Sequence, residues 1–140
     1  MSVYVTQTNR NFTLKQENVI PAYNALSQYV KEKAAERDVI SFGRQTFYSL
    51  VLSDSSLCDM MEDLGFALGH HQPNEEGYSD IEFLEEEWDD SYHEVLNAIA
   101  PYVEDGSFLE FSKEEGDLFR VAFHNGTTQV IHPQVIWPTL

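Results

Sequence analysis

Histidine is the residue type in this sequence that most readily supports catalysis or metal binding, and the chain has five histidines. His93-Glu94 begins like the His-Glu-x-x-His pattern of zinc proteases, but position 97 is Asn97. That pattern needs two imidazoles four residues apart on one helix face, and here the second is missing. His70 and His71 are adjacent at the end of the predicted strand 66–70, and because adjacent residues on a strand point to opposite faces, only one of them can join a site across a hairpin. The sequence predicts no metal site and no cofactor.

Other catalytic signatures are also missing. Cys58 lies in a predicted helix without a basic neighbour that would lower the pKa of its thiol, which is typical of a structural cysteine. The phosphate-binding glycine loops, the nucleophile elbow and the calcium-binding loop do not occur. Carboxylate pairs are numerous, so an acid/base pair of the glycosidase kind stays open, although a run of acids is more typical of a solvated face than of a desolvated cleft. The sequence predicts that the chain is not an enzyme.

Acidic residues are concentrated in the middle of the chain. Residues 75–94 carry ten acids and neither lysine nor arginine, and the 68 residues between Arg44 and Lys113 hold 17 of the 24 acids. The formal net charge is −16. This charge argues against a nucleic-acid-binding face and against docking on anionic lipid. It favours a cationic partner, with high solubility as the alternative explanation.

We therefore predict that the acidic stretch binds a basic protein. Aromatic residues within it can supply the buried anchors that charge does not provide, and Trp88 is the predicted anchor. The predicted partner-binding residues are Glu75, Glu76, Asp80, Glu82, Glu85, Glu86, Glu87, Trp88, Asp89 and Asp90. The alternative is that these acids form only a solvated face and that Phe83 and Tyr92 belong to the core.

The length of 140 residues predicts a single domain, residues 1–140. A chain of this size buries roughly two thirds of its unfolded surface, so it needs no disulfide or metal to stay folded. The single cysteine, the absence of a signal-peptide pattern at the start and the lack of a long apolar run predict a cytoplasmic protein.

Apolar periodicity predicts three helices at residues 19–36, 56–64 and 91–102. Asn18 is the predicted cap of the first helix, Asp54 or Ser55 of the second, and Asp89 or Asp90 of the third. Residues 38–53 are predicted to be a short strand or an irregular segment. Gly65 suits the position after the end of the second helix.

Alternating apolar residues predict the strands. One or two strands occupy 3–14, a hairpin joins 66–70 to 80–84, and a three-stranded meander covers 107–112, 118–124 and 128–132, with a further edge segment at 134–137. Asn125-Gly126 is typical of a type I′ turn. The sequence thus predicts an α+β fold in which about three helices pack on one face of an antiparallel sheet.

The segment APYVEDGSFLEF and the later GDLFRVAFHNG and VIW resemble small acidic accessory proteins of phages and mobile elements. In that group a helix is followed by V-x-D-G-S-[FY]-[IL]-E, an aromatic strand and a tight N-G or D-G turn. Residues 100–111 and 118–126 match this pattern, with Phe119 and Phe123 where tryptophans are usual. The group includes antirestriction-like and anti-CRISPR proteins. The resemblance implies a phage-type accessory protein and assigns no functional residue.

The leading hypothesis is an acidic inhibitor that blocks the nucleic-acid-binding surface of a host defence protein, a CRISPR effector or restriction enzyme, by charge mimicry. One alternative is an immunity protein that neutralises a basic nuclease toxin. Another is a small enzyme, which predicts a pocket lined by at least two of the histidines His70, His71, His93 and His124. The exposed aromatics and the predicted edge segment are compatible with a homodimer.

Overall fold

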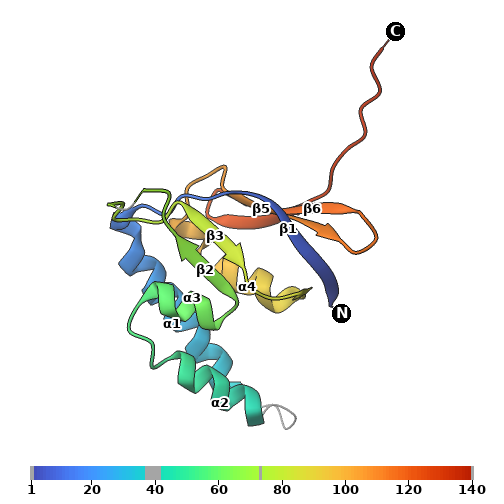
Figure 1. Cartoon of the computed structure of the whole chain (residues 1–140). Coiled ribbons are helices and arrows are strands. Elements are labelled where there is room, and N and C mark those ends of the chain that lie inside the picture. Colours follow the sequence, from blue (N-terminus) through green and yellow to red (C-terminus); the bar gives the residue numbers. More distant parts are fainter. Residues whose placement is uncertain (1, 37–41, 73, 140) are drawn as a thin grey trace.

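The computed structural model describes residues 2–36, 42–72 and 74–139. It consists of an antiparallel sheet that curves over a layer of helices, with a separate two-stranded hairpin at one side (Figure 1). The larger sheet has the order β4-β1-β5-β6-β7. These strands are β1 (Val3–Asn11), β4 (Glu87–Trp88), β5 (Phe108–Lys113), β6 (Leu118–His124) and β7 (Thr127–Ile131). The predicted α+β class with an antiparallel sheet is confirmed.

Strand β1 is one continuous strand of nine residues rather than the two short strands that were the alternative. It pairs with β4 at its start and with β5 along the rest of its length. The pairing shifts register between Gln7 and Asn9, as at a β-bulge. The strand β4, which the sequence did not predict, extends the sheet beyond β1.

The predicted hairpin forms from β2 (Phe66–Gly69) and β3 (Asp80–Phe83), with Ile81 and Phe83 buried and Glu82 exposed. The side chain of Gln7 fastens this hairpin to the main sheet. Its Nε2 donates a hydrogen bond to the carbonyl oxygen of Ile81 at 3.0 Å, and its Oε1 accepts one from the backbone N–H of Phe83 at 2.7 Å. One amide side chain therefore takes the place of a backbone partner between β1 and β3.

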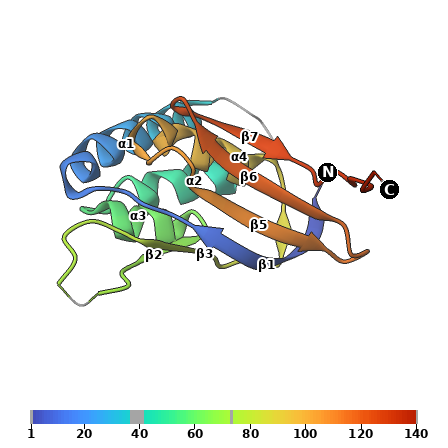
Figure 2. The ribbon, with the colours of Figure 1, turned by 90° about the horizontal axis from the view of Figure 1, so that it is seen from above.

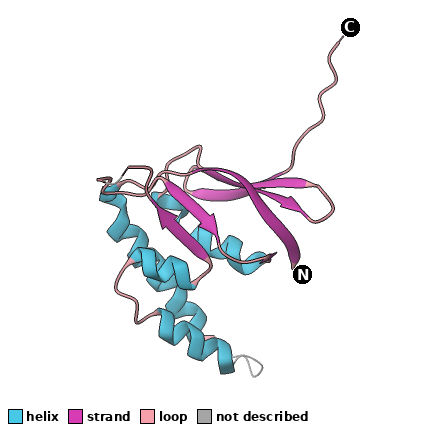
Figure 3. Cartoon of the chain, viewed as in Figure 1, coloured by secondary structure: helices cyan, strands magenta, loops and turns pink. Residues whose placement is uncertain are grey.

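Helices cover one face of the sheet, and the opposite face of β5 and β6 carries none (Figures 2 and 3). The described helices are α1 (Val19–Ala35), α2 (Phe42–Val51), α3 (Leu57–Asp63) and α4 (Asp90–Ile99), with short 3₁₀ turns η1 (Gln16–Asn18) and η2 (Ala100–Tyr102). Helix α1 agrees with its prediction, and Asn18 occupies its cap position. The side-chain amide of Asn18, however, donates to the carbonyl oxygen of Tyr102 at 3.2 Å instead of capping the helix.

The prediction for residues 38–53 is wrong over 42–51, where the structure has the helix α2, whereas 52 and 53 form a turn. Its buried residues Tyr48 and Val51 are three positions apart, whereas Phe47 and Leu50 are exposed. A short apolar run of this kind fits either a strand or a helix, and periodicity alone does not separate the two. The part of the prediction that covers 38–41 lies outside the described residues.

The N-terminal cap of α3 differs from its prediction, and that of α4 is one of the two predicted residues. Ser56, rather than Asp54 or Ser55, caps α3, and its hydroxyl accepts a hydrogen bond from the N–H of Asp59. Asp89 caps α4, which ends at Ile99 and continues as η2 through Tyr102. Gly65 has a φ of 106°, as expected for a residue that follows a helix end.

The predicted meander is confirmed in β5, β6 and β7, and Asn125 and Gly126 both have positive φ, as a type I′ turn requires. Residues 134–137 are not a strand, which contradicts the predicted edge segment. After Ile131 the chain leaves the sheet at Pro133, which cannot donate a ladder hydrogen bond, and runs away from the body of the protein (Figure 1).

An aromatic cluster joins the two sheets and α4. It consists of Phe66, Phe83, Trp88, Tyr92, Phe111 and Phe119. The ring centroids of Phe83 and Tyr92 lie 4.9 Å apart, as do those of Trp88 and Phe111. Trp88 is 7% exposed at the centre of this cluster. These contacts hold the hairpin, the short strand β4 and the start of α4 against the sheet.

We expect Trp88→Ala to lower the free energy of unfolding by about 3–5 kcal/mol, because it leaves a cavity among five neighbouring rings. Urea denaturation followed by circular dichroism measures this loss. Trp137→Ala is the matched control, since Trp137 is 83% exposed and its loss should change stability by less than about 0.5 kcal/mol. Equal effects of the two substitutions would contradict the central place of Trp88 in the core.

Candidate functional site

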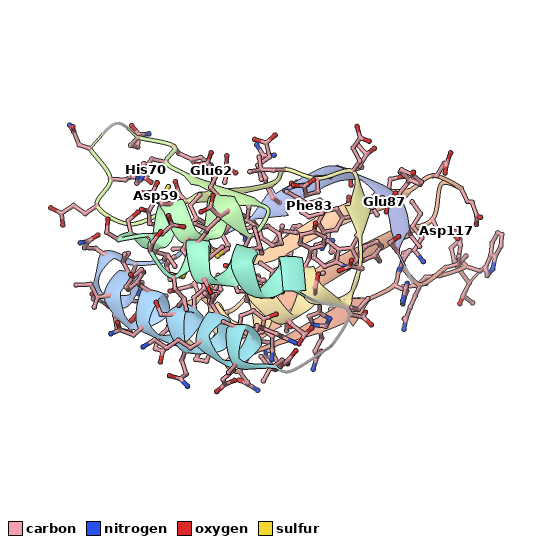
Figure 4. The ribbon with its side chains drawn as sticks, turned by 90° about the horizontal axis from the view of Figure 1, so that it is seen from below. Asp59, Glu62, His70, Phe83, Glu87 and Asp117 are labelled. Carbon is pink, nitrogen blue, oxygen red and sulfur yellow. The ribbon has the colours of Figure 1, made fainter. Side chains whose placement is uncertain are left out.

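The predicted acidic stretch forms a corner of the molecule. The chain leaves β3, passes through 84–86, forms the short strand β4 and begins α4 at Asp90. Several acids therefore follow one another along this short connection between β3 and α4. We call this surface the acidic corner and define it by Glu82, Glu85, Glu86, Glu87, Asp89 and Asp90. All of these except Asp89 are exposed. Seen from below, Glu87 of this corner and Asp59 and Glu62 of α3 lie along one side of the molecule (Figure 4).

The exposed acids of the acidic corner form no ion pair with any residue that the structure describes. Within this corner, Glu87 accepts a hydrogen bond from the hydroxyl of Ser2 at 3.0 Å. A hydrogen bond from the Tyr4 hydroxyl to Glu87, and then the charge of Glu87, raise the pKa of Tyr4. The remaining carboxylates are available to a cationic partner.

Two other members of the predicted set are engaged within the chain. Asp80 forms a salt bridge to Arg10, with 2.6 Å between the carboxylate oxygen and Nε. Glu75 accepts a hydrogen bond from the hydroxyl of Ser79 at 2.6 Å, and this bond lowers the pKa of the Glu75 carboxyl. Glu76 is exposed in the same loop. The structure therefore brings Glu82 and the acids of 85–90 together and leaves Glu75, Glu76 and Asp80 around the far end of the hairpin.

Asp89 has a structural task within the acidic corner. Its carboxylate accepts a hydrogen bond from the backbone N–H of Ser91 at 2.9 Å and another from the Ser91 hydroxyl. It thereby provides a hydrogen-bond acceptor for a backbone N–H in the first turn of α4. The positive end of the helix dipole at this turn also stabilises the negative charge of Asp90. Part of the acidic run thus belongs to the helix start.

The prediction that Trp88 is the anchor for a partner is not supported by its position. The indole ring is buried in the aromatic cluster, because the side chains along 87–89 alternate and the apolar one turns inward. Leu84, which is 45% exposed, is the large apolar side chain that lies at the surface among these acids. Phe83 is in the core, and Tyr92 is partly buried against it.

A crevice of about 230 Å³ opens beside the acidic corner, between α1, α2, α4 and the residues that follow α3 and β3. We call it the aromatic crevice. It is lined by Tyr29, Phe47, Tyr48, Asp63, Leu64, Gly65, Glu85, Ser91, Tyr92 and Val95. Its walls are aromatic rings and its charged groups are two carboxylates. Burial, and then the charge of Glu85, raise the pKa of the Tyr92 hydroxyl, which keeps it protonated as a hydrogen-bond donor.

The sequence did not reveal this crevice. Its rings come from α1, α2 and α4, and α2 was not predicted to be a helix. Gly65 permits the approach of its walls, because a Cβ at that position would lie 2.8 Å from Cε1 of Tyr92. In the sequence, the glycine at position 65 is the one local signal for this close approach. Glycine is the residue that most readily adopts the positive φ found after a helix end.

Asp63 also interacts with a second carboxyl group, that of Asp54. A hydrogen bond to Asp63, burial and the charges of Asp63 and Asp59 raise the pKa of Asp54 to about 6. The two groups therefore share a proton in the folded state under mildly acidic conditions. Because the carboxyl of Asp54 binds its proton more tightly in the folded state than in the unfolded state, it favours folding at low pH, and this contribution is lost as the pH rises through 6.

The five histidines are spread over the loop after β2, helix α4, the end of β6 and the segment after β7, and they do not form one site. His70 stacks on Tyr78 with 4.9 Å between ring centroids, and His93 on α4 is hydrogen-bonded to the hydroxyl of Thr128 at 2.6 Å. His124 lies 3.7 Å from Asp105, and His71 and His132 are exposed. The enzyme alternative predicted a pocket lined by at least two of His70, His71, His93 and His124. No histidine lines the aromatic crevice, so the crevice is not that pocket.

Within residues 2–36, 42–72 and 74–139, no group of three or more histidine, cysteine or acidic residues is placed to hold a metal ion. None of the helices in these residues is both long enough and apolar enough to cross a membrane. No protein-family model, curated protein or solved structure matches the chain.

We expect Asp54→Asn to raise the melting temperature more at about pH 7.5 than at about pH 5, because the amide replaces a carboxyl group that resists ionisation. Thermal unfolding at the two pH values measures the difference. Asp117→Asn removes one charge from the exposed turn between β5 and β6 and should give the same small change at both (Figure 4). A gain from Asp54→Asn that does not depend on pH would contradict the shared proton.

Proposed function

We propose that the protein is an inhibitor that binds a basic, nucleic-acid-binding protein and occupies the surface which that protein uses for nucleic acid. The observation that supports this most strongly is the acidic corner, where exposed carboxylates project without ion pairs among the described residues. Concentrating like charges costs stability through self-repulsion, which an interaction with a cationic partner would relieve.

The mechanism is competition. Duplex DNA presents one negative charge per roughly 1.7 Å of its axis, and the acids of 82–90 likewise present several negative charges along a strand, a bend and a helix start. Such a field steers a basic groove toward the acidic corner and increases the rate of association. Once the corner occupies that groove, nucleic acid is excluded from it.

The aromatic crevice adds specificity to this attraction. Its rings and its two carboxylates, Asp63 and Glu85, suit a guanidinium group, which stacks on aromatic faces and pairs with carboxylates. We propose that an arginine side chain of the partner enters the crevice while neighbouring basic residues contact the acidic corner. This arrangement supplies the anchor that Trp88, buried in the core, does not supply.

The class of target follows from the resemblance of the sequence to small acidic phage proteins. It points to a host defence protein, a CRISPR effector or a restriction enzyme, and to action in the cytoplasm of a bacterial host. The same acidic corner would also serve an immunity protein against a basic nuclease toxin. Identification of the bound partner separates these two roles.

We expect the tagged protein to retain a basic, nucleic-acid-binding protein from host lysate at about 0.1 M salt and to release it at about 0.5 M, because salt screens exposed charges. The triple substitution Glu85→Lys, Glu86→Lys and Glu87→Lys should abolish this capture. Mass spectrometry identifies the partner, and a gel-shift assay tests whether the protein displaces nucleic acid from it.

The matched control is Glu17→Lys, Glu32→Lys and Glu104→Lys, at exposed positions on η1, on α1 and just after η2. It changes the net charge by the same amount at a different place, so capture should persist. Equal capture by both triple variants would contradict a specific role of the acidic corner. Capture of a partner whose nucleic-acid binding is unaffected would contradict the inhibitory mechanism.

For the crevice, we expect acetyl-arginine amide to shift the NMR resonances of Tyr29, Tyr48 and Tyr92, whereas the neutral acetyl-citrulline amide should not. The double substitution Asp63→Asn and Glu85→Gln should weaken the arginine effect about tenfold or more, since it removes both charges from the crevice. Identical shifts with the two compounds would show that the charge of the guanidinium is not recognised there.

A further inference from the structure

Charge is divided unevenly along this chain. Residues 118–140 contain neither aspartate nor glutamate, although they include Arg120 and two histidines. All 24 acids therefore lie in the first 117 residues, and 118–140 is the longest stretch without one. In the structure this stretch forms β6, the edge strand β7 and the extended segment 132–139. We call the surface of residues 118–139 the acid-free face.

The acid-free face is also where apolar side chains are most exposed. Six of the eleven exposed large hydrophobic residues in the described chain belong to it: Leu118, Val130, Ile131, Val135, Ile136 and Trp137. Val135, Ile136 and Trp137 are each about 80% exposed or more and stand in a row between two prolines. Exposed apolar groups that are contiguous in this way mark interaction surfaces.

A groove of about 430 Å³ lies between the outer face of the sheet and the start of segment 132–139. Its apolar walls include Leu118, Ile131 and Ile136. The two charged residues in it, Glu110 and Arg120, neutralise each other through a 2.9 Å salt bridge. The helices lie on the other side of the sheet, so this groove is open to a partner (Figures 1 and 2).

We propose that a second copy of this chain docks on the acid-free face, with segment 132–139 of each copy lying in the groove of the other. A twofold interface places the same patch of both copies face to face, so it requires a patch that does not repel itself. Each copy carries a net charge of −16, and acidic surfaces elsewhere repel one another. The acid-free face carries no acid, its one arginine, Arg120, is paired with Glu110, and it exposes six large apolar side chains, which suits it to self-association.

This interface has a salt dependence that distinguishes it from the proposed function. Repulsion between the acidic remainders of two copies weakens when salt screens it, so dimerisation should become stronger as the salt concentration rises. Binding of a basic partner through the acidic corner should become weaker under the same change. Failure of either interaction can therefore be recognised without the other.

The test is sedimentation equilibrium of the full chain from about 1 µM to about 1 mM, at about 0.05 M and about 0.5 M salt. We expect the mass of two chains at high concentration, with a smaller dissociation constant at the higher salt. The emission of Trp137 should shift to shorter wavelength as the dimer forms, and Trp137→Phe should abolish that shift because Trp88 is buried in both states.

Ile136→Glu places a charge in the interface and should weaken dimerisation about tenfold or more. Ile20→Glu is the matched control, since Ile20 is 70% exposed on α1 and outside the acid-free face, and it should dimerise like the unmodified chain. Circular dichroism checks that both variants are folded. The mass of one chain under every condition would overturn the proposal, and so would a dimer that Ile136→Glu leaves unchanged. A monomer that binds a different protein through these residues would also overturn it and would assign the face to that protein.

Discussion

The aromatic cluster beneath the acidic corner holds together a part of the chain that its own charges drive apart. Phe83 and Trp88 are five residues apart, and both insert into the space between the hairpin, the main sheet and α4. Burying such rings contributes several kcal/mol, on the order of 1.5–3 for each side chain. Exposed carboxylates, in contrast, repel one another weakly through water. The balance allows Glu85, Glu86 and Glu87 to stay at the surface of a well-packed structure.

The same packing decides the geometry of the candidate site. Because Tyr92 belongs to the aromatic cluster on one side and lines the aromatic crevice on the other, the crevice is fixed next to the acidic corner. Gln7 contributes from a distance, since its side-chain amide holds β3 in place beside β1 and thus fixes where the chain turns toward Glu85. The proposed partner surface is therefore supported by side chains that never contact a partner.

Two surfaces of different character emerge from this arrangement. The acidic corner and the crevice combine charge with aromatic rings, whereas the acid-free face exposes apolar groups without net negative charge. The sheet separates these two surfaces. Helices cover one of its sides (Figures 1 and 3), and the crevice lies among them, whereas the groove lies on the other side. A chain with a charge of −16 can use the first surface for a basic protein and the second for another copy of itself.

Local signals in the sequence determined much of the fold. The meander, the Asn125-Gly126 turn, the cap at Asp89 and the glycine after α3 each depend on residues close in sequence, so their patterns were readable in advance. Tertiary packing decided the rest. It made residues 42–51 a helix, buried Trp88 instead of presenting it, and built the crevice from three helices. Those outcomes depend on contacts between residues far apart in the chain. The pattern of apolar and polar residues along a short segment does not predict such contacts.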